Sequence, residues 1–380
     1  MGDWTSDANE ALKLTLVRST EDTESFAEDE LYGFHPTFTY PIYGEDEKLY
    51  GYQGLEIDLR FASGSLIQYL NIKYTNKLDS TSTVDDVEGI LSRFIPPGYF
   101  KDEQKFLAFV EEDATTFHPL GQLIHSYTRP ALSASTEKGK ATSSSQSLDP
   151  GREDSVATWN TSGFKELHRR MQIFILLYIE AGSYINEDEN SWEFVVLYEK
   201  RKRREAPYAA TYHFVGYSSL YPFYFFPEKT RMRLSQFVIL PPYQHRGHGS
   251  ELYKAIYQYT LSRPNIAELT LEDPAEAFED LRDRNDLRML FNKAWLEKWR
   301  NDLKIAGRQF HRLVEMLLLL RLDSSDAAAE RAYRIQVKER LYRFNFEILA
   351  QLEKEERLEK LEETYQSVRQ DYSRILAMVS

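Results

Sequence analysis

The chain has 380 residues, 42 % apolar and 14 % aromatic, which excludes a wholly disordered chain and allows roughly two to three domains. Its 60 acidic and 47 basic side chains give a net charge of −13, which disfavours direct DNA binding and favours a basic partner. Cysteine is absent and no run approaches the roughly 20 apolar residues of a membrane span, which excludes disulfides, a thiolate zinc site and a cysteine nucleophile and predicts no membrane association.

Residues 1–132 predict an N-terminal mixed α/β domain. Strands are expected over 50–61 and 65–74, which are rich in aromatic and β-branched side chains, and a helix over 85–95. Residues 133–162 contain mostly Ser, Thr, Gly, Lys and Asp, and this composition predicts a loop or disordered insertion. A partner-binding tail is the alternative for that segment.

Residues 163–292 predict a mixed sheet with flanking helices. The strands are expected over 192–200, 211–226, 233–240 and 266–271, and the helices over 250–261 and 275–290. The apolar run 173–185 is interpreted as a buried strand, although a helix fits it as well. A helix separates the last two strands, so this pair is expected to be parallel.

Residues 293–380 predict only helices. The segment 310–322 is apolar enough for a buried helix, and 340–378 has apolar residues at three- and four-residue steps between charges. We expect a C-terminal helical bundle that packs on the rest of the chain, with a partner-docking helix as the alternative. The fold class is therefore α+β.

The most informative segment is the strand-to-helix connection at 240–250, with the sequence LPPYQHRGHGS. Gly247 and Gly249 leave backbone N–H groups accessible, and the following helix directs its positive end to the same place. Such a loop suits a pyrophosphate, although a tight turn without a ligand is the alternative. The segment lacks both the Gly-Lys-Ser/Thr of a nucleotide-hydrolysing loop and the spacing of a dinucleotide-binding loop.

The spacing Gln244-x-x-Gly247-x-Gly249 resembles the acetyl-coenzyme A signature of the Gcn5-related N-acetyltransferase superfamily. Two longer segments, SQFVILPPYQHRGHGSELYKAI and LTLEDPAEAFEDLRDRNDL, are similar to the type B histone acetyltransferase catalytic subunit, and a fungal source is expected. The resemblance covers most of residues 10–290. It implies acetyl-coenzyme A as cosubstrate, no metal, and direct acetyl transfer to lysines in the N-terminal tail of free, newly synthesised histone H-four.

A lysine amine is protonated at neutral pH and must lose its proton before it can attack a thioester. The resemblance implies Glu272, at the end of the last strand, as the general base. Asp273 is a second candidate, although a carboxylate there also fits a helix cap. Glu180 is a third carboxylate that the resemblance places near the substrate amine.

The resemblance also implies the residues that contact the coenzyme and the peptide. The coenzyme set contains a strand, the loop and one arginine: Phe237, Val238, Ile239, Gln244, His245, Arg246, Gly247, His248, Gly249, Ser250 and Arg284. Arg246 and His248 are expected to face the phosphates or solvent. The peptide set contains an acidic loop and a group around three aromatic side chains: Glu45, Asp46, Glu47, Trp192, Tyr221, Pro222 and Phe223. A solvated acidic turn and buried aromatic residues are the alternatives.

The implied partners are the histone tail peptide, free histones and a WD40-repeat histone chaperone of the retinoblastoma-binding type. The start of the chain has no basic region followed by an apolar run, so no secretory signal is expected, and we predict a location in the cytoplasm and nucleus. Two other functions stay open at this point. One is a small-amine or other protein N-acetyltransferase of the same fold, and the other is a non-catalytic histone chaperone.

Overall fold

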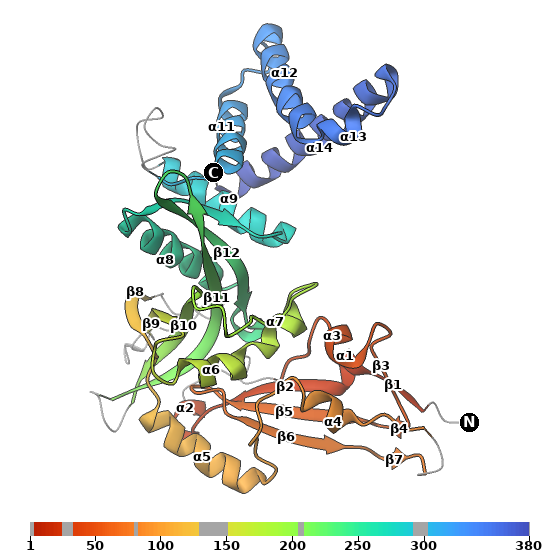
Figure 1. Cartoon of the computed structure of the whole chain (residues 1–380), viewed down its shortest axis with the longest axis vertical. Helices are drawn as coiled ribbons and strands as arrows, with labels where there is room; N and C mark the ends of the chain where they lie inside the picture. The colour runs from red at the N-terminus through yellow and green to blue at the C-terminus, as the bar shows by residue number, and fades with distance from the viewer. Residues whose placement is uncertain are drawn as a thin grey trace, which may run out of the picture. The chain divides into compact units, whose positions relative to one another are not determined.

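The computed structural model describes residues 4–24, 33–79, 83–128, 151–203, 209–291 and 303–379. The chain divides into two compact units. Unit 1 contains Met1–Pro222 and Arg233–Tyr259, and unit 2 contains Phe223–Met232 and Thr260–Ser380. Helices and strands both contribute, which confirms the α+β class (Figure 1).

The N-terminal part of unit 1 contains a three-stranded sheet, drawn in orange and red in Figure 1. Strand β5 (Glu56–Ala62) pairs in parallel with β2 (Leu12–Val17) and antiparallel with β6 (Gln68–Lys73). Helix α5 (Glu103–Thr116) covers this sheet through Phe106 and Val110, which pack with Ala62 and Tyr69. The smaller elements here are β1 (Thr5–Asp7), α1 (Ala8–Ala11), α2 (Thr20–Thr23), α3 (Tyr40–Tyr43), β3 (Lys48–Tyr50), β4 (Tyr52–Gln53), β7 (Asn76–Lys77) and α4 (Val87–Leu91).

The single strand expected over 50–61 is divided into β3, β4 and β5. Gly51 and Gly54 separate these strands, with φ angles of 100° and 60°. Residues with a side chain rarely adopt such positive φ angles. The two glycines therefore permit turns in which the backbone of most other residues would be strained. The aromatic and β-branched content of the segment predicted extended backbone correctly but did not indicate where it turns.

The second sheet has six strands in the order β13-β12-β11-β10-β9-β8. Their bounds are β8 (Gln122–Thr128), β9 (Gly151–Thr158), β10 (Glu193–Lys202), β11 (Ala210–Phe225), β12 (Lys229–Ile239) and β13 (Ile266–Leu271). Strand β9 lies inside the loop expected over 133–162, so that expectation is wrong for residues 151–158. It pairs with β8 on one side and β10 on the other, and this pairing stabilises a strand whose composition is polar. Residues 133–150 lie outside the described residues.

The apolar run at 173–185 begins with a helix, so the prediction of a buried strand is wrong. Helix α7 (Ile173–Tyr178) follows α6 (Phe164–Met171), and all five residues from Ile173 to Leu177 are buried. A segment that is buried on every side has no polar face, so its sequence lacks the periodicity that would distinguish helix from strand. The peptide N–H of Ala181 then donates to the hydroxyl of Tyr40 at 2.6 Å.

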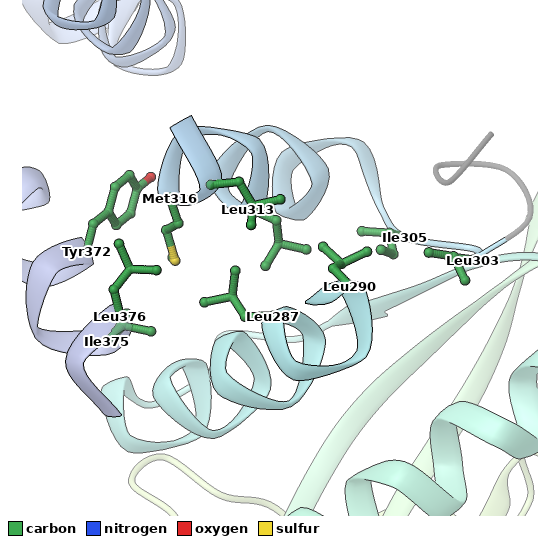
Figure 2. Packing of buried hydrophobic residues seen from close by; sticks show 10 residues of the cluster. Leu287, Leu290, Leu303, Ile305, Leu313, Met316, Tyr372, Ile375 and Leu376 are labelled. Atoms are coloured by element: carbon green, nitrogen blue, oxygen red, sulfur yellow. The ribbon is translucent and has the colours of Figure 1, made fainter. Parts of the chain in front are cut away.

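The helices of unit 2 pack around two hydrophobic clusters. They are α9 (Glu276–Phe291), α11 (Gly307–Arg321), α12 (Ala327–Phe344), α13 (Phe346–Leu349) and α14 (Lys354–Val379). Figure 2 shows Leu287 and Leu290 of α9 in one cluster with side chains from α11 and α14. The boundary expected at residue 293 therefore does not separate two hydrophobic cores. None of the helices within the described ranges combines the length and apolar character that crossing a bilayer requires.

Candidate active site

The predicted phosphate loop connects β12 to α8 (His248–Ser262) in unit 1. After Ile239 the backbone forms a short 3₁₀ turn, η2 (Pro241–Tyr243), and the side-chain amide of Gln244 donates to the carbonyl of Ile239 at 2.8 Å. This bond closes the loop against the strand that it leaves. The predicted loop residue Gln244 thus has a structural role through its side chain.

The end of the loop has the geometry of an anion-binding turn. His245 and Gly247 have positive φ angles of 58° and 78°. The N–H of Glu251 donates to the carbonyl of Gly247 at 3.3 Å, which places the first turn of α8 directly after the loop. Helix α8 presents its positive end at this point. A left-handed turn at the positive end of a helix is a favourable place for an anion.

The polar side chains behind the loop hold it in place. The Tyr243 hydroxyl accepts a hydrogen bond from Arg18 at 3.1 Å and donates one to Glu199 at 3.2 Å. Glu199 is 1 % exposed and also pairs with Arg152 and Arg201, at 3.0 and 2.9 Å. Burial raises the pKa of Tyr243 to about 12, so it remains a hydroxyl at neutral pH. A buried charge is costly unless it is paired, and here two arginines pair with the carboxylate of Glu199, while Arg18 is linked to it through the hydroxyl of Tyr243.

His248 occupies a different environment from the one predicted. Its side chain is 3 % exposed, and its Nδ1 lies 2.8 Å from the hydroxyl of Tyr127 on β8. We expected this side chain to face either phosphates or solvent, and its burial shows that it does not face solvent. The ring anchors the first residue of α8 to the sheet. His245 is exposed and Arg246 is partly exposed, as a solvent-facing loop requires.

An acidic group near the start of α8 has no signal in the sequence. Within the described ranges, neither carboxylate oxygen of the fully buried Asp154 has a hydrogen-bond partner. Burial, together with the charge of Glu251, raises the pKa of Asp154 to about 8. Glu251 in turn lies 3.8 Å from His125. Over the same ranges, no three His, Asp or Glu side chains are arranged to hold a metal ion.

The predicted catalytic carboxylates Glu272 and Asp273 directly follow β13, in unit 2, and both are exposed. Asp273 has a φ of 34°, a left-handed conformation that Asp tolerates better than most residues. The carbonyl of Ala275 accepts from the N–H groups of Phe278 and Glu279 and begins α9. The residue before α9 is thus Ala275, which does not agree with the alternative of Asp273 as helix cap.

Two further predicted residues lie on other elements. Arg284 is on α9 in unit 2, where its Nε donates to the carbonyl of Asp280 at 3.1 Å. Glu180 is exposed and follows α7 in unit 1. The predicted carboxylates therefore come from different units, which a linear sequence does not reveal.

The acidic loop at 45–47 contains two kinds of side chain. Glu45 and Asp46 are exposed. Glu47 instead accepts hydrogen bonds from the N–H groups of Thr39 and Tyr40, at 2.6 and 3.0 Å, and from the amide of Asn9 at 2.8 Å. Both of its oxygens are used, so Glu47 stabilises this loop itself.

The predicted aromatic residues lie at the ends of β10 and β11. The rings of Trp192 and Tyr221 meet edge to face with centroids 4.8 Å apart, and both are partly exposed. Pro222 is also partly exposed, and the neighbouring Phe223 is 37 % exposed. The alternative of a fully buried aromatic core is therefore wrong at these positions.

Three families match consecutive parts of the chain. They are described as histone acetyl transferase HAT1 N-terminus over residues 4–180, acetyltransferase (GNAT) family over 171–279, and fungal HAT1, C-terminal over 278–323. The acetyltransferase fold implies acetyl-coenzyme A as the acetyl donor. Among solved structures, an aminoglycoside acetyltransferase from a soil metagenomic sample aligns with 39 % of this chain and 91 % of its own. The TM-score is 0.25 and the identity is 14 %.

Curated relatives match over nearly the whole chain. The type B histone acetyltransferase catalytic subunit of Cryptococcus neoformans is 50 % identical, over 99 % of this chain and 98 % of that protein. The proteins of the same name from Mycosarcoma maydis and Mus musculus are 44 % and 32 % identical, over 97 % and 99 % of this chain and 87 % and 94 % of theirs. The chain is an acetyltransferase and belongs to the family of type B histone acetyltransferase catalytic subunits.

Proposed function

We propose that this acetyltransferase transfers the acetyl group of acetyl-coenzyme A to lysines in the N-terminal tail of free, newly synthesised histone H-four. The observation that carries the proposal is identity of up to 50 %, over 99 % of the chain, with relatives named as type B histone acetyltransferases. The net charge of −13 supports it, because an acidic protein attracts a basic histone tail.

The proposed mechanism is direct transfer within a ternary complex. Acetyl-coenzyme A supplies an activated thioester. Glu272 takes the proton from the lysine ammonium, and the neutral amine forms the new C–N bond as the C–S bond breaks and the coenzyme leaves as its thiol. Asp273 and Glu180 are the other proposed carboxylates of the site. The chain has no cysteine, which supports a route without a cysteine acyl-enzyme, and no metal is part of the proposal.

The proposed coenzyme contacts come from backbone more than from side chains. Backbone N–H groups of the loop 244–250 hold the pyrophosphate, and the backbone of residues 237–239 at the end of β12 pairs with the pantetheine arm. The left-handed turn at Gly247 and the positive end of α8 support this assignment. Arg284 is proposed as a further contact.

The proposed peptide contacts are the exposed carboxylates Glu45 and Asp46 and the aromatic side chains of Trp192, Tyr221 and Phe223, with Pro222 between the last two. Carboxylates suit the lysines of a histone tail, and partly exposed rings offer a surface for its backbone. For Glu47 we propose an indirect role, because both of its oxygens hold the loop that carries the other two carboxylates.

We further propose a WD40-repeat histone chaperone of the retinoblastoma-binding type as partner, action in both cytoplasm and nucleus, and no direct DNA binding. Family membership supports the first two proposals. The acidic balance supports the third, since phosphate backbones repel a negatively charged protein.

The test is transfer of labelled acetyl from acetyl-coenzyme A to three substrates at equal concentration: a histone H-four tail peptide, free histones and nucleosomes. Label on the peptide and on free histones, with little on nucleosomes, is the expected result. Equal labelling of nucleosomes would contradict the preference for free histones. Coenzyme binding without label on any histone would instead favour a small-amine acetyltransferase.

A further inference from the structure

The helix that follows the proposed base shares its core with the C-terminus of the chain. Leu287 of α9 is fully buried among residues of α11 and α14, and Figure 2 shows these side chains converging on it. From α14 the cluster receives Tyr372, Ile375 and Leu376. Helix α9 is therefore held from its apolar side by elements that come much later in the sequence.

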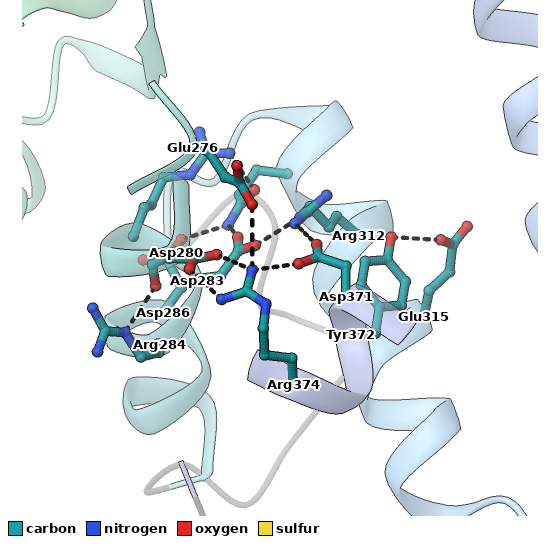
Figure 3. A network of polar contacts seen from close by, with 12 residues as sticks. Glu276, Asp280, Asp283, Arg284, Asp286, Arg312, Glu315, Asp371, Tyr372 and Arg374 are labelled. Atoms are coloured by element: carbon teal, nitrogen blue, oxygen red, sulfur yellow. Dashed lines mark hydrogen bonds and ion pairs between the residues drawn. The ribbon is translucent and has the colours of Figure 1, made fainter. Parts of the chain in front are cut away.

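A polar network holds the other end of α9 (Figure 3). The guanidinium of Arg374, on α14, binds both oxygens of Asp280, with the Nη2 bond at 2.8 Å, and also contacts Asp371 at 2.5 Å. The hydrogen bond from Arg374 lowers the pKa of Asp280, so this pair persists at neutral pH. Glu276, in the first turn of α9, lies 3.9 Å from the same guanidinium.

A second arginine extends the network to a third helix. Arg312 on α11 bonds to Asp283 of α9 at 2.6 Å and to Asp371 of α14 at 2.8 Å. Asp283 is fully buried and accepts a further bond from Gln309 at 2.8 Å. Three helices are thus joined by bonds to charged groups, which are stronger and more directional than neutral ones.

The contacts of this network with α9 begin only a few residues after the proposed base. Glu276 and Asp280 belong to the first two turns of α9, and the segment from Glu272 to Ala275 is all that separates them from β13. Asp273 within that segment has a left-handed φ of 34°. Strained backbone of this kind persists only where the surrounding structure restrains it.

We infer that Arg374 is a positioning residue, and that through Asp280 it fixes the start of α9 and hence the orientation of the Glu272 carboxylate. The inference rests on the proposed role of Glu272. Arg374 acts on the reaction only through the start of α9, so its loss should lower the rate of proton removal. Coenzyme binding should stay the same, because Asp283 and Leu287 still hold the part of α9 that carries Arg284. Misplacement of a catalytic group by about 1 Å can cost a hundredfold in rate.

The test compares full-length Arg374→Ala and Arg374→Lys with the wild type. For Arg374→Ala we expect a kcat about tenfold lower, with the KM for acetyl-coenzyme A unchanged. Lysine retains the charge but cannot span both oxygens of Asp280, so Arg374→Lys should be intermediate. Hydrogen exchange of the backbone amides at 271–279 should be fastest in Arg374→Ala, intermediate in Arg374→Lys and slowest in the wild type.

Arg343→Ala is the matched control, because Arg343 is an exposed arginine of unit 2 that pairs with Glu339 on its own helix α12. It should leave both kcat and the exchange at 271–279 unchanged. A wild-type kcat in Arg374→Ala, or unchanged exchange at 271–279, would overturn the inference. If the wild type labels no histone, the proposed function fails instead, and the exchange measurement alone decides whether Arg374 restrains this segment.

Discussion

Gly216 on β11 faces the carbonyl of Val238 on β12 so closely that no side chain fits between them. A Cβ at position 216 would lie 2.2 Å from that oxygen and 2.9 Å from the side chain of Ile239. Both contacted residues belong to the strand end that we propose for the pantetheine arm. The spacing of the two strands at this point therefore depends on a hydrogen atom in place of a methyl group.

Gly216→Ala should destabilise the protein by about 1–3 kcal/mol and weaken coenzyme binding, because β12 must move away from β11. Thermal unfolding and titration with acetyl-coenzyme A measure the two effects. Gly151→Ala on β9 is the matched control, since the nearest atom to its Cβ within the described residues would be the carbonyl oxygen of Lys200, at 4.0 Å. Equal behaviour of the two variants would contradict this account.

Glu272→Gln should keep the affinity for the coenzyme and lower kcat by about 10²–10⁴-fold, because glutamine cannot accept the proton of the lysine. The loss should be largest at low pH, where more of the substrate amine is protonated. Steady-state kinetics between pH 6 and 9, together with coenzyme binding, give the answer. Activity close to that of the wild type would move the base role to Glu180 or Asp273.

Replacing Glu45 and Asp46 together by Gln and Asn should raise the KM for the histone tail peptide severalfold, because two exposed carboxylates no longer face the basic tail. The KM for acetyl-coenzyme A should not change. The effect should shrink as salt is added, since screening weakens exposed charge pairs. Unchanged peptide kinetics at low salt would rule out this loop as a peptide contact.

Glu47→Ala should act differently and lower the stability by about 1–3 kcal/mol, because the N–H groups of Thr39 and Tyr40 lose their acceptor. Thermal unfolding of the free enzyme measures this loss. An increased peptide KM without any loss of stability would instead make Glu47 a direct peptide contact.

Asp154→Asn should remove a pH dependence of stability. Since burial raises the pKa of Asp154 to about 8, the folded state binds this proton more tightly than the unfolded state does. The wild type should therefore lose stability as the pH rises from about 4 to about 8, and this loss should be complete above that range. The free energy of unfolding of the variant, measured relative to that of the wild type, should therefore rise by about 2–4 kcal/mol from pH 5 to pH 9. If the free energies of unfolding of variant and wild type differ by the same amount at pH 5 and at pH 9, Asp154 is not a buried neutral carboxyl.

The sequence predicted the elements around the phosphate loop well, because each has a distinct pattern. Strand β13 was expected over its observed residues, and α8 was expected to within two residues at its start. The strand β9 could not be predicted, because its polar residues are held in the sheet by β8 and β10 rather than by their own propensity. Helix α7 had no polar face to indicate its period.

The predicted and the missed site residues also differ in whether a local pattern in the sequence marks them. The loop 244–250 and the carboxylates at 272–273 are local motifs, and a motif is visible in one dimension. Asp154, Tyr127 and Arg374 gain their roles from partners roughly 90 to 120 residues away, and no local pattern marks such a pair. His248 shows the limit within the motif itself, since its burial depends on Tyr127.

The bond between Arg374 and Asp280 also has a consequence for the order of synthesis. The two residues are 94 positions apart in the sequence. At roughly 5–20 residues per second, a ribosome needs between about 5 and 19 s to add that stretch after Asp280. During this interval Leu287 and Leu290 have no helix α14 to pack against, so a nascent chain carries exposed apolar surface next to the proposed base until α14 has been synthesised.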